Sequence, residues 1–140
     1  MKYSVILMFA SLTAVGCGGA KLQPQLIHGE VTVAGGKVET GQVRFVPIEN
    51  TPGPTNAASI VDGQYRVEGR GGLLVGKYRV EVDAKKKTGR KTRGYTGTEM
   101  GMIDETVRIG PEVYAGPQSS LVIEVVAGSD GRIDIAIPVP

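Results

Sequence analysis

The chain has 140 residues, the length of one domain, and its 16 Lys and Arg against 14 Asp and Glu give a net charge of +2. So small a net charge does not predict a nucleic-acid-binding protein. A single Cys, a single His and no Trp exclude a disulfide framework and a Cys/His zinc site. They also leave few of the residues that acid-base or nucleophilic catalysis recruits.

Residues 1–16 are predicted to be an export signal. Lys2 supplies the positive start, and the apolar stretch that runs to Val15 is too short for a membrane-spanning helix, which needs about 20 residues. Small residues then precede Cys17, and this pattern resembles the lipobox of bacterial lipoproteins, with Ala14 where Leu is commonest. The resemblance implies that the Cys17 thiol receives a diacylglycerol and that the signal is cut before it. Ordinary secretory cleavage and a retained segment with a buried cysteine are the alternatives.

Residues 17–26 are predicted to be the lipidated cysteine and a flexible tether. They carry Gly, Gln and Pro without an apolar period, and the nine residues after Cys17 span roughly 30 Å at most. One acyl chain holds a protein only marginally, whereas two or three hold it firmly. We therefore expect a location in the cell envelope, anchored to a membrane by lipid and facing the periplasm or the exterior.

Residues 27–140 are predicted to form one all-β domain, because short β-branched runs alternate with Gly, Pro and Asp. The clearest unit is a hairpin over residues 57–68 with a two-residue type I′ turn at Asp62-Gly63. This register sets Ile60 opposite Tyr65 and Ala58 opposite Val67.

Further strands are predicted at residues 29–33, 42–48, 77–83, 121–126 and 133–137. Pro47 indicates an edge or a strand end. In the run 77–83, alternation points Tyr78, Val80 and Val82 inward and points Lys77, Arg79, Glu81 and Asp83 outward. About seven strands with one apolar face each favour a seven-stranded, two-sheet β-sandwich.

The order of these motifs resembles carboxypeptidase regulatory-like (transthyretin-like) domains. The resemblance rests on Gly29-Glu30-Val31-Thr32-Val33, Gly41-Gln42-Val43-Arg44-Phe45, Asp62-Gly63-Gln64-Tyr65 and Gly76-Lys77-Tyr78-Arg79-Val80. With Pro111-Glu112-Val113-Tyr114 before a closing strand pair, the chain is similar to small planctomycete lipoproteins that carry such domains. The resemblance implies a prealbumin-like or Ig-like sandwich and no catalytic residues.

A basic segment is the main candidate for a binding site. Six positive charges fall in the nine residues 85–93, and Gly94, Gly97 and Gly101 predict that the segment continues as a flexible loop. Such a loop attracts anionic lipid, polysaccharide or another polyanion, with a strength that falls as salt rises. The alternative is a solvated loop with no specific contact. The candidate anion contacts are Lys85, Lys86, Lys87, Arg90, Lys91 and Arg93.

Other candidates for chemistry are weaker. His28 has no G-x-S-x-G serine to form a triad with, and Asp130 with Asp134, like Asp104 with Glu105, lacks the spacing of a calcium loop. These carboxylates are expected to cap turns or face water. Tyr65, Tyr78 and Tyr114 could offer a sugar platform, but Tyr65 and Tyr78 fall on predicted inward faces, which favours core positions for these two.

The sequence therefore predicts a non-enzymatic, lipid-anchored envelope protein that serves as a structural or protein-interaction module. We expect no catalytic residue, metal, cofactor or nucleic-acid partner. The partners expected are the membrane, through Cys17, and an envelope protein, polysaccharide or anionic lipid. The alternative is a binding module for an anionic or carbohydrate envelope component through residues 85–93.

Overall fold

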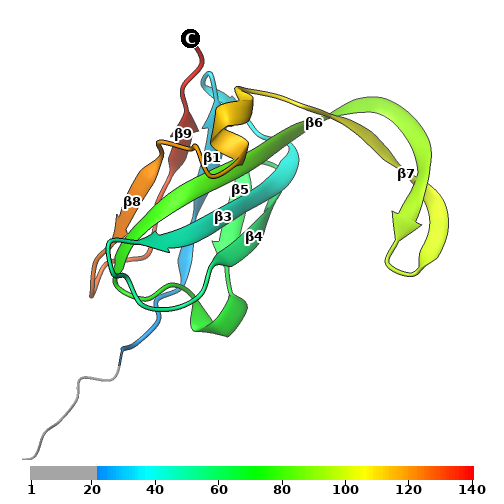
Figure 1. Cartoon of the computed structure of the whole chain (residues 1–140). Coiled ribbons are helices and arrows are strands. Elements are labelled where there is room, and N and C mark those ends of the chain that lie inside the picture. The colour runs from blue at the N-terminus through cyan, green and yellow to red at the C-terminus, as the bar shows by residue number, and fades with distance from the viewer. Residues whose placement is uncertain (1–21) are drawn as a thin grey trace, which may run out of the picture.

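The structure, a computed structural model, describes residues 22–140 and is almost entirely β (Figure 1). The strands are β1 (Ile27–Val33), β2 (Gly36–Lys37), β3 (Thr40–Ile48), β4 (Asn56–Val61), β5 (Gln64–Val67), β6 (Gly76–Thr96), β7 (Glu99–Arg108), β8 (Val122–Val125) and β9 (Ile135–Ile137). The described residues add two short 3-10 helices, η1 (Gly69–Gly71) and η2 (Glu112–Ala115), and no α-helix. The all-β prediction is confirmed.

The strands form a curled, mainly antiparallel sheet in the order β2-β1-β5-β4-β3-β6-β7. β8 pairs with β6 and β9 pairs with β1, and the β1–β9 pair is parallel. Pro47 lies beyond Phe45, where the ladder of β3 with β4 ends, so its predicted place at a strand end is confirmed.

The β4–β5 hairpin has the predicted turn. Asp62 and Gly63 both have positive φ, 50° and 82°, as a type I′ turn requires. Ile60 pairs with Tyr65 in the predicted register. Both of these side chains are buried, and the Tyr65 ring lies 5.6 Å from the ring of Phe45 on β3.

The core is built from the inward positions of each strand. Tyr78, Val80 and Val82 are buried as predicted, and Ile135 and Ile137 close the core from β9. Apolar burial of this kind supplies the main driving force of folding. The fully buried side chains are Ile27, Val31, Val38, Val43, Phe45, Ile60, Val67, Leu73, Tyr78, Val80 and Val125.

The outward prediction for Glu81 is wrong. Its side chain is only 3% exposed, although it alternates correctly with the core residues of β6. Arg44 is its direct cross-strand neighbour, and Arg79 lies two residues along the same strand. Both guanidinium groups contact the Glu81 carboxylate, at 3.3 Å and 2.9 Å, and these long side chains cover it.

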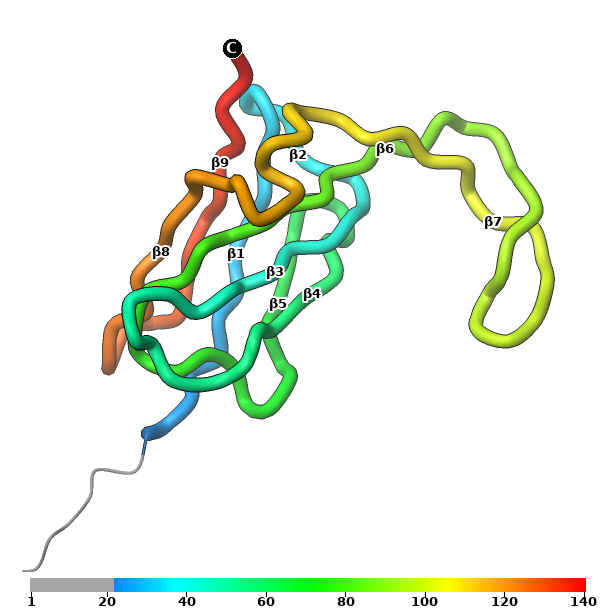
Figure 2. The backbone as a smooth tube through the Cα atoms, in the orientation of Figure 1, coloured from blue at the N-terminus to red at the C-terminus, as the bar shows by residue number. Residues whose placement is uncertain are grey.

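The predicted flexible loop at residues 85–101 is also wrong, because β6 continues through it. The ladder of β6 with β3 ends at Lys85, and beyond that residue β6 pairs only with β7. This two-stranded ribbon projects away from the remaining strands (Figures 1 and 2). We call residues 85–108 the arm, and the rest of the described chain the body.

Candidate functional site: a projecting ribbon with a basic stem and an apolar tip

The arm ends in a tight turn. Thr96 pairs with Glu99, so only Gly97 and Thr98 connect the strands. Gly97 has φ +71°, and Thr98 is not among the residues with positive φ, which fits a Gly-first type II′ turn. The glycine that the sequence assigned to a flexible loop therefore closes a regular hairpin.

A bulge interrupts the stem of the arm. Between the pairs Lys87–Thr106 and Lys91–Asp104, residues 88–90 of β6 lie opposite the single residue Glu105. Bulges of this kind bend a ribbon and increase its twist. The extra length is accommodated at Gly89, whose φ is +83°.

Glu105 holds the bulge together. Its carboxylate accepts hydrogen bonds from the Thr88 hydroxyl at 2.6 Å and from Nε of Arg90 at 2.8 Å. The Thr88 hydroxyl also accepts a hydrogen bond from the Arg90 N–H at 3.3 Å. The bend is thus fixed by a specific set of contacts.

Most of the predicted anion contacts already have a carboxylate partner. Lys87 and Lys91 both contact Asp104, at 3.3 Å and 2.7 Å, and their hydrogen bonds and charges hold the Asp104 pKa below its ordinary value. Lys85 pairs with Asp83, and Arg90 pairs with Glu105. Among the described residues, Lys86 and Arg93 alone of the six cations make no ion pair.

The tip of the arm is apolar on one face. Tyr95 pairs with Met100 and Arg93 with Met102, and directly opposed residues of an antiparallel pair share a face. Tyr95, Met100 and Met102 are 68%, 61% and 60% exposed. The arm therefore presents three large apolar side chains to solvent beside a basic residue.

The sequence reading missed this apolar tip. It gave no role to Tyr95 or to the methionines. The signal was nevertheless local: around the Gly97 turn, Tyr95, Met100 and Met102 fall at the alternate positions that a hairpin places together.

A hollow of about 460 Å³ lies on the body between β1, β5 and the segment before β9. Cross-strand pairing sets His28 beside Arg66 on one side and Arg132 on the other. The lining residues are His28, Gly29, Glu30, Val61, Asp62, Gln64, Tyr65, Arg66 and Arg132.

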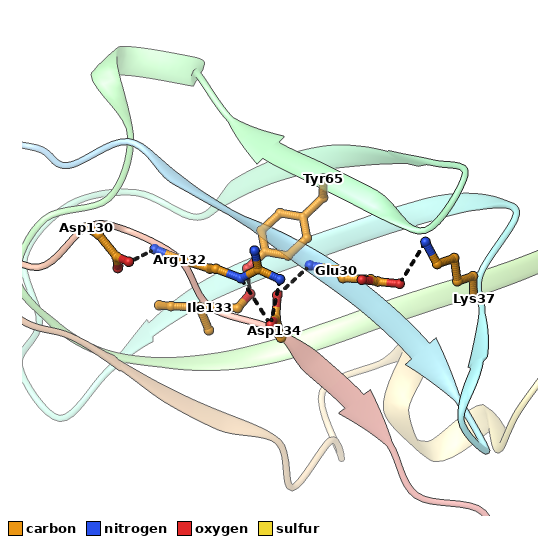
Figure 3. A network of polar contacts seen from close by, with 7 residues as sticks. All are labelled: Glu30, Lys37, Tyr65, Asp130, Arg132, Ile133 and Asp134. Atoms are coloured by element: carbon orange, nitrogen blue, oxygen red, sulfur yellow. Dashed lines mark hydrogen bonds and ion pairs between the residues drawn. The ribbon is translucent and has the colours of Figure 1, made fainter.

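Three of these lining residues, Glu30, Tyr65 and Arg132, belong to a network of polar contacts (Figure 3). The Tyr65 hydroxyl donates to the Ile133 carbonyl at 2.6 Å, and the Glu30 N–H donates to Asp134 at 2.9 Å. These two bonds attach the segment before β9 to β5 and β1, and within that segment Arg132 also donates to Asp134, at 3.1 Å. Burial, and then the charge of Asp134, raise the pKa of Tyr65 well above its ordinary value.

The two aspartates near β9 cap backbone groups, as expected. Asp130 accepts a hydrogen bond from the Arg132 N–H at 3.0 Å. The Glu30 N–H, and after it Arg132, hold the Asp134 pKa below its ordinary value. Within residues 22–140 no three His, Cys, Asp or Glu side chains lie together in a way that could hold a metal ion.

The remaining candidates lie in the core or outside the described chain. Tyr65 and Tyr78 are buried, and the Tyr78 hydroxyl donates to the Leu74 carbonyl at 2.9 Å, which confirms their predicted core positions. Ser119 is buried and donates to the Val80 carbonyl. His28 is half-buried near the start of β1. The predicted lipidation site, Cys17, lies outside the described residues.

Comparison with family models, with curated proteins and with solved structures gives no match to this chain. Across residues 22–140 no helix is long and apolar enough to cross a membrane.

Proposed function

We propose that the chain is a non-enzymatic, lipid-anchored protein of the cell envelope whose body is a two-sheet β-sandwich and whose arm docks on another envelope component. The lipid is attached at Cys17, and residues 18–26 connect it to the body. The observation that carries the docking role is the arm, a ribbon held away from the body with an apolar tip exposed to solvent.

The arm has a cost in stability, and this cost supports a functional role for it. A two-stranded ribbon is marginally stable by itself, and exposed apolar side chains give up the free energy that burial would provide. Grouped exposed apolar side chains mark interaction sites in soluble domains. Meanwhile three residues that line the hollow on the body, Glu30, Tyr65 and Arg132, bond to neighbouring aspartates or to the backbone, which supports a structural role for them.

A second proposal is an anion-binding module that works through the basic residues of the arm. Lys86 and Arg93 support it, because neither makes an ion pair among the described residues. The other four cations must release Asp83, Asp104 or Glu105 before they can bind a ligand fully. Anion binding through the arm would therefore depend mainly on Lys86 and Arg93, and less on the four cations that make ion pairs.

The test is cross-linking in intact cells, followed by capture of the chain and identification of what it holds. The variant to compare carries Tyr95→Ser, Met100→Ser and Met102→Ser. Loss of a reproducible cross-linked component in this variant supports docking through the arm. A matched control replaces three exposed valines of the body with Ser in the same way: Val61, Val113 and Val122.

Two results would overturn separate parts of the proposal. An unmodified Cys17 thiol in the membrane-purified protein, measured by mass spectrometry against Cys17→Ser, removes the lipid anchor. Cross-linked components that are identical in the tip variant and the wild type remove the docking role.

A further inference from the structure

We propose that the tip of the arm enters the headgroup region of an anionic bilayer, with Tyr95, Met100 and Met102 inserted and Lys91 and Arg93 against the lipid phosphates. This inference rests on the proposed function and specifies what the arm contacts. The arm would then be a second membrane contact beside the lipid at Cys17.

The tip has the amphipathic character that a membrane interface requires. The pairs Lys91–Asp104, Arg93–Met102 and Tyr95–Met100 follow one another along one face, so this face passes from charged to apolar toward the turn. Near the turn the opposite face carries small and polar residues, Gly94, Thr96, Glu99 and Gly101, and next along it Thr92 pairs with the half-buried Ile103. Aromatic rings and basic side chains at an apolar edge are the usual anchors of proteins at a bilayer surface.

The arm and the body carry net charges of opposite sign. Residues 85–108 contain seven Lys and Arg against three Asp and Glu, a net charge of +4. The described residues of the body contain seven Lys and Arg against eleven Asp and Glu, a net charge of −4. An anionic surface therefore attracts the arm and repels the body, within a Debye length of about 8 Å at physiological salt.

A second copy of the chain is the competing occupant, since its body is acidic. However, seven of the eleven acidic residues of the body already make ion pairs with basic residues: Glu30, Glu49, Glu68, Glu81, Asp83, Glu112 and Asp134. In contrast, the negative charges of an anionic bilayer are not paired with basic side chains and extend over an area large enough to face the whole arm. The observations thus favour the bilayer.

The direction in which the arm points is compatible with a lipid anchor at Cys17. Lys85 pairs with Thr40, which pairs on its other side with Val61, and this end of the body is opposite Ile27, where the N-terminal segment enters. Figure 1 shows that the arm then curls, and that its tip points back toward the end of the body at which residue 22 lies. The tip and Cys17 can therefore face the same bilayer.

The absence of Trp from the chain provides a direct test. The Tyr95→Trp protein is purified from cell membranes with its anchor and reconstituted into vesicles of phosphatidylcholine alone, or with about 30% phosphatidylglycerol, in about 50 mM salt. In the anionic vesicles we expect the tryptophan emission of this protein to be blue-shifted and to be quenched by brominated phosphatidylcholine. Both signals should weaken in about 500 mM salt.

Two further variants sharpen the result. A Val122→Trp protein places the reporter at a position that is 55% exposed on β8, and it should show neither blue shift nor quenching. Arg93→Gln, made in the Tyr95→Trp protein, removes a charge that lies opposite Met102 and makes no ion pair among the described residues. It should lower the ratio of inserted to free tip about fivefold.

The inference would be overturned if the Tyr95→Trp and Val122→Trp proteins gave the same tryptophan emission in anionic vesicles. A blue shift of the Tyr95→Trp protein that grows with protein concentration in detergent without vesicles would also overturn it, because a second copy would then cover the tip. An arm-dependent cross-link to a protein, together with no quenching by brominated lipid, would leave the docking function standing and remove only the bilayer as its target.

Discussion

Glu81 is a buried carboxylate held between two guanidinium groups. Oε1 of Glu81 accepts hydrogen bonds from Nη2 and Nε of Arg79 at 2.9 Å and 3.3 Å, and Arg44 lies 3.3 Å from Oε2. Oε2 is buried and makes no hydrogen bond, so loss of Arg79 leaves neither oxygen of this buried carboxylate with a hydrogen bond among the described residues. We expect Arg79→Met to lower the free energy of unfolding by about 2–3 kcal/mol, measured by urea denaturation.

The control is Arg66→Met, because Arg66 is an exposed residue that lies 3.9 Å from Glu68. Exposed pairs contribute little, so this change should cost at most about 0.5 kcal/mol. Adding Glu81→Leu to Arg79→Met should recover most of the loss, since the buried charge is then gone. Equal costs for Arg79→Met and Arg66→Met would contradict the buried-pair account.

Asp134 makes the stability of the β9 attachment dependent on pH. Its folded pKa is depressed, so its contribution is fully present above the unfolded pKa of about 3.9 and is lost as pH falls through the folded pKa. We expect the unfolding free energy of the wild type to fall more steeply than that of Asp134→Asn between about pH 4 and pH 2. Urea titrations at each pH measure the two slopes.

Asp62→Asn is the matched control, because the Asp62 carboxylate makes no ion pair or side-chain hydrogen bond among the described residues. Its pH slope should equal that of the wild type. If the unfolding free energy of Asp134→Asn fell with pH as steeply as that of the wild type, the hydrogen bond between the Glu30 N–H and Asp134 would not contribute to the pH dependence of stability.

The bulge is the element that gives the arm its bend, and Glu105 is its clamp. In Glu105→Ala the Thr88 hydroxyl and the Arg90 guanidinium lose their shared acceptor. We expect arm amides to exchange with solvent about 5–30-fold faster, the equivalent of about 1–2 kcal/mol, while amides of the body keep their protection. Hydrogen exchange followed by NMR separates the two regions.

Glu99→Ala provides the comparison at the end of the same strand, because the Glu99 side chain makes no hydrogen bond or ion pair among the described residues. It should leave the exchange of the stem unchanged. Faster exchange throughout the body in Glu105→Ala would mean that arm and body unfold as one unit.

Elements with a local signal could be predicted from the sequence, and elements without a buried face could not. The β4–β5 hairpin was predictable because Asp62-Gly63 specifies its turn and Ile60 and Tyr65 mark its apolar face. In the arm, residues 91–96 alternate between two faces of which neither contacts a core, so no apolar period distinguishes a ribbon from a loop.

The error at Glu81 has a different origin. Alternation correctly gave its face of β6, but burial there depends on Arg44, which arrives from β3 only after the sheet has formed. The apolar tip was missed for a related reason. Tyr95 meets Met100 and Met102 only across a turn that the sequence reading had assigned to a flexible loop.

At the scale of the whole molecule, the arm makes most of its contacts within itself. Among the described residues, every side-chain hydrogen bond and ion pair made by residues 88–106 has its partner within the arm. The hydrogen bond to the body that lies farthest along β6 is the one that the Lys87 N–H donates to Glu39, at 3.0 Å. Local contacts of this kind form an independent unit of stability.

Replacing residues 87–106 with Asn-Gly therefore tests how the molecule is divided. The pair Lys86–Val107 would close a two-residue hairpin, for which Asn-Gly is the preferred sequence. We expect the body to fold with its unfolding free energy changed by at most about 1 kcal/mol, because its buried residues lie outside the excised segment. Cooperative urea unfolding and retained NMR dispersion of core residues such as Phe45 measure this outcome. If the excised chain lost its cooperative transition, the arm would be part of the folding unit, and effects of tip variants on binding would have to be separated from effects on stability.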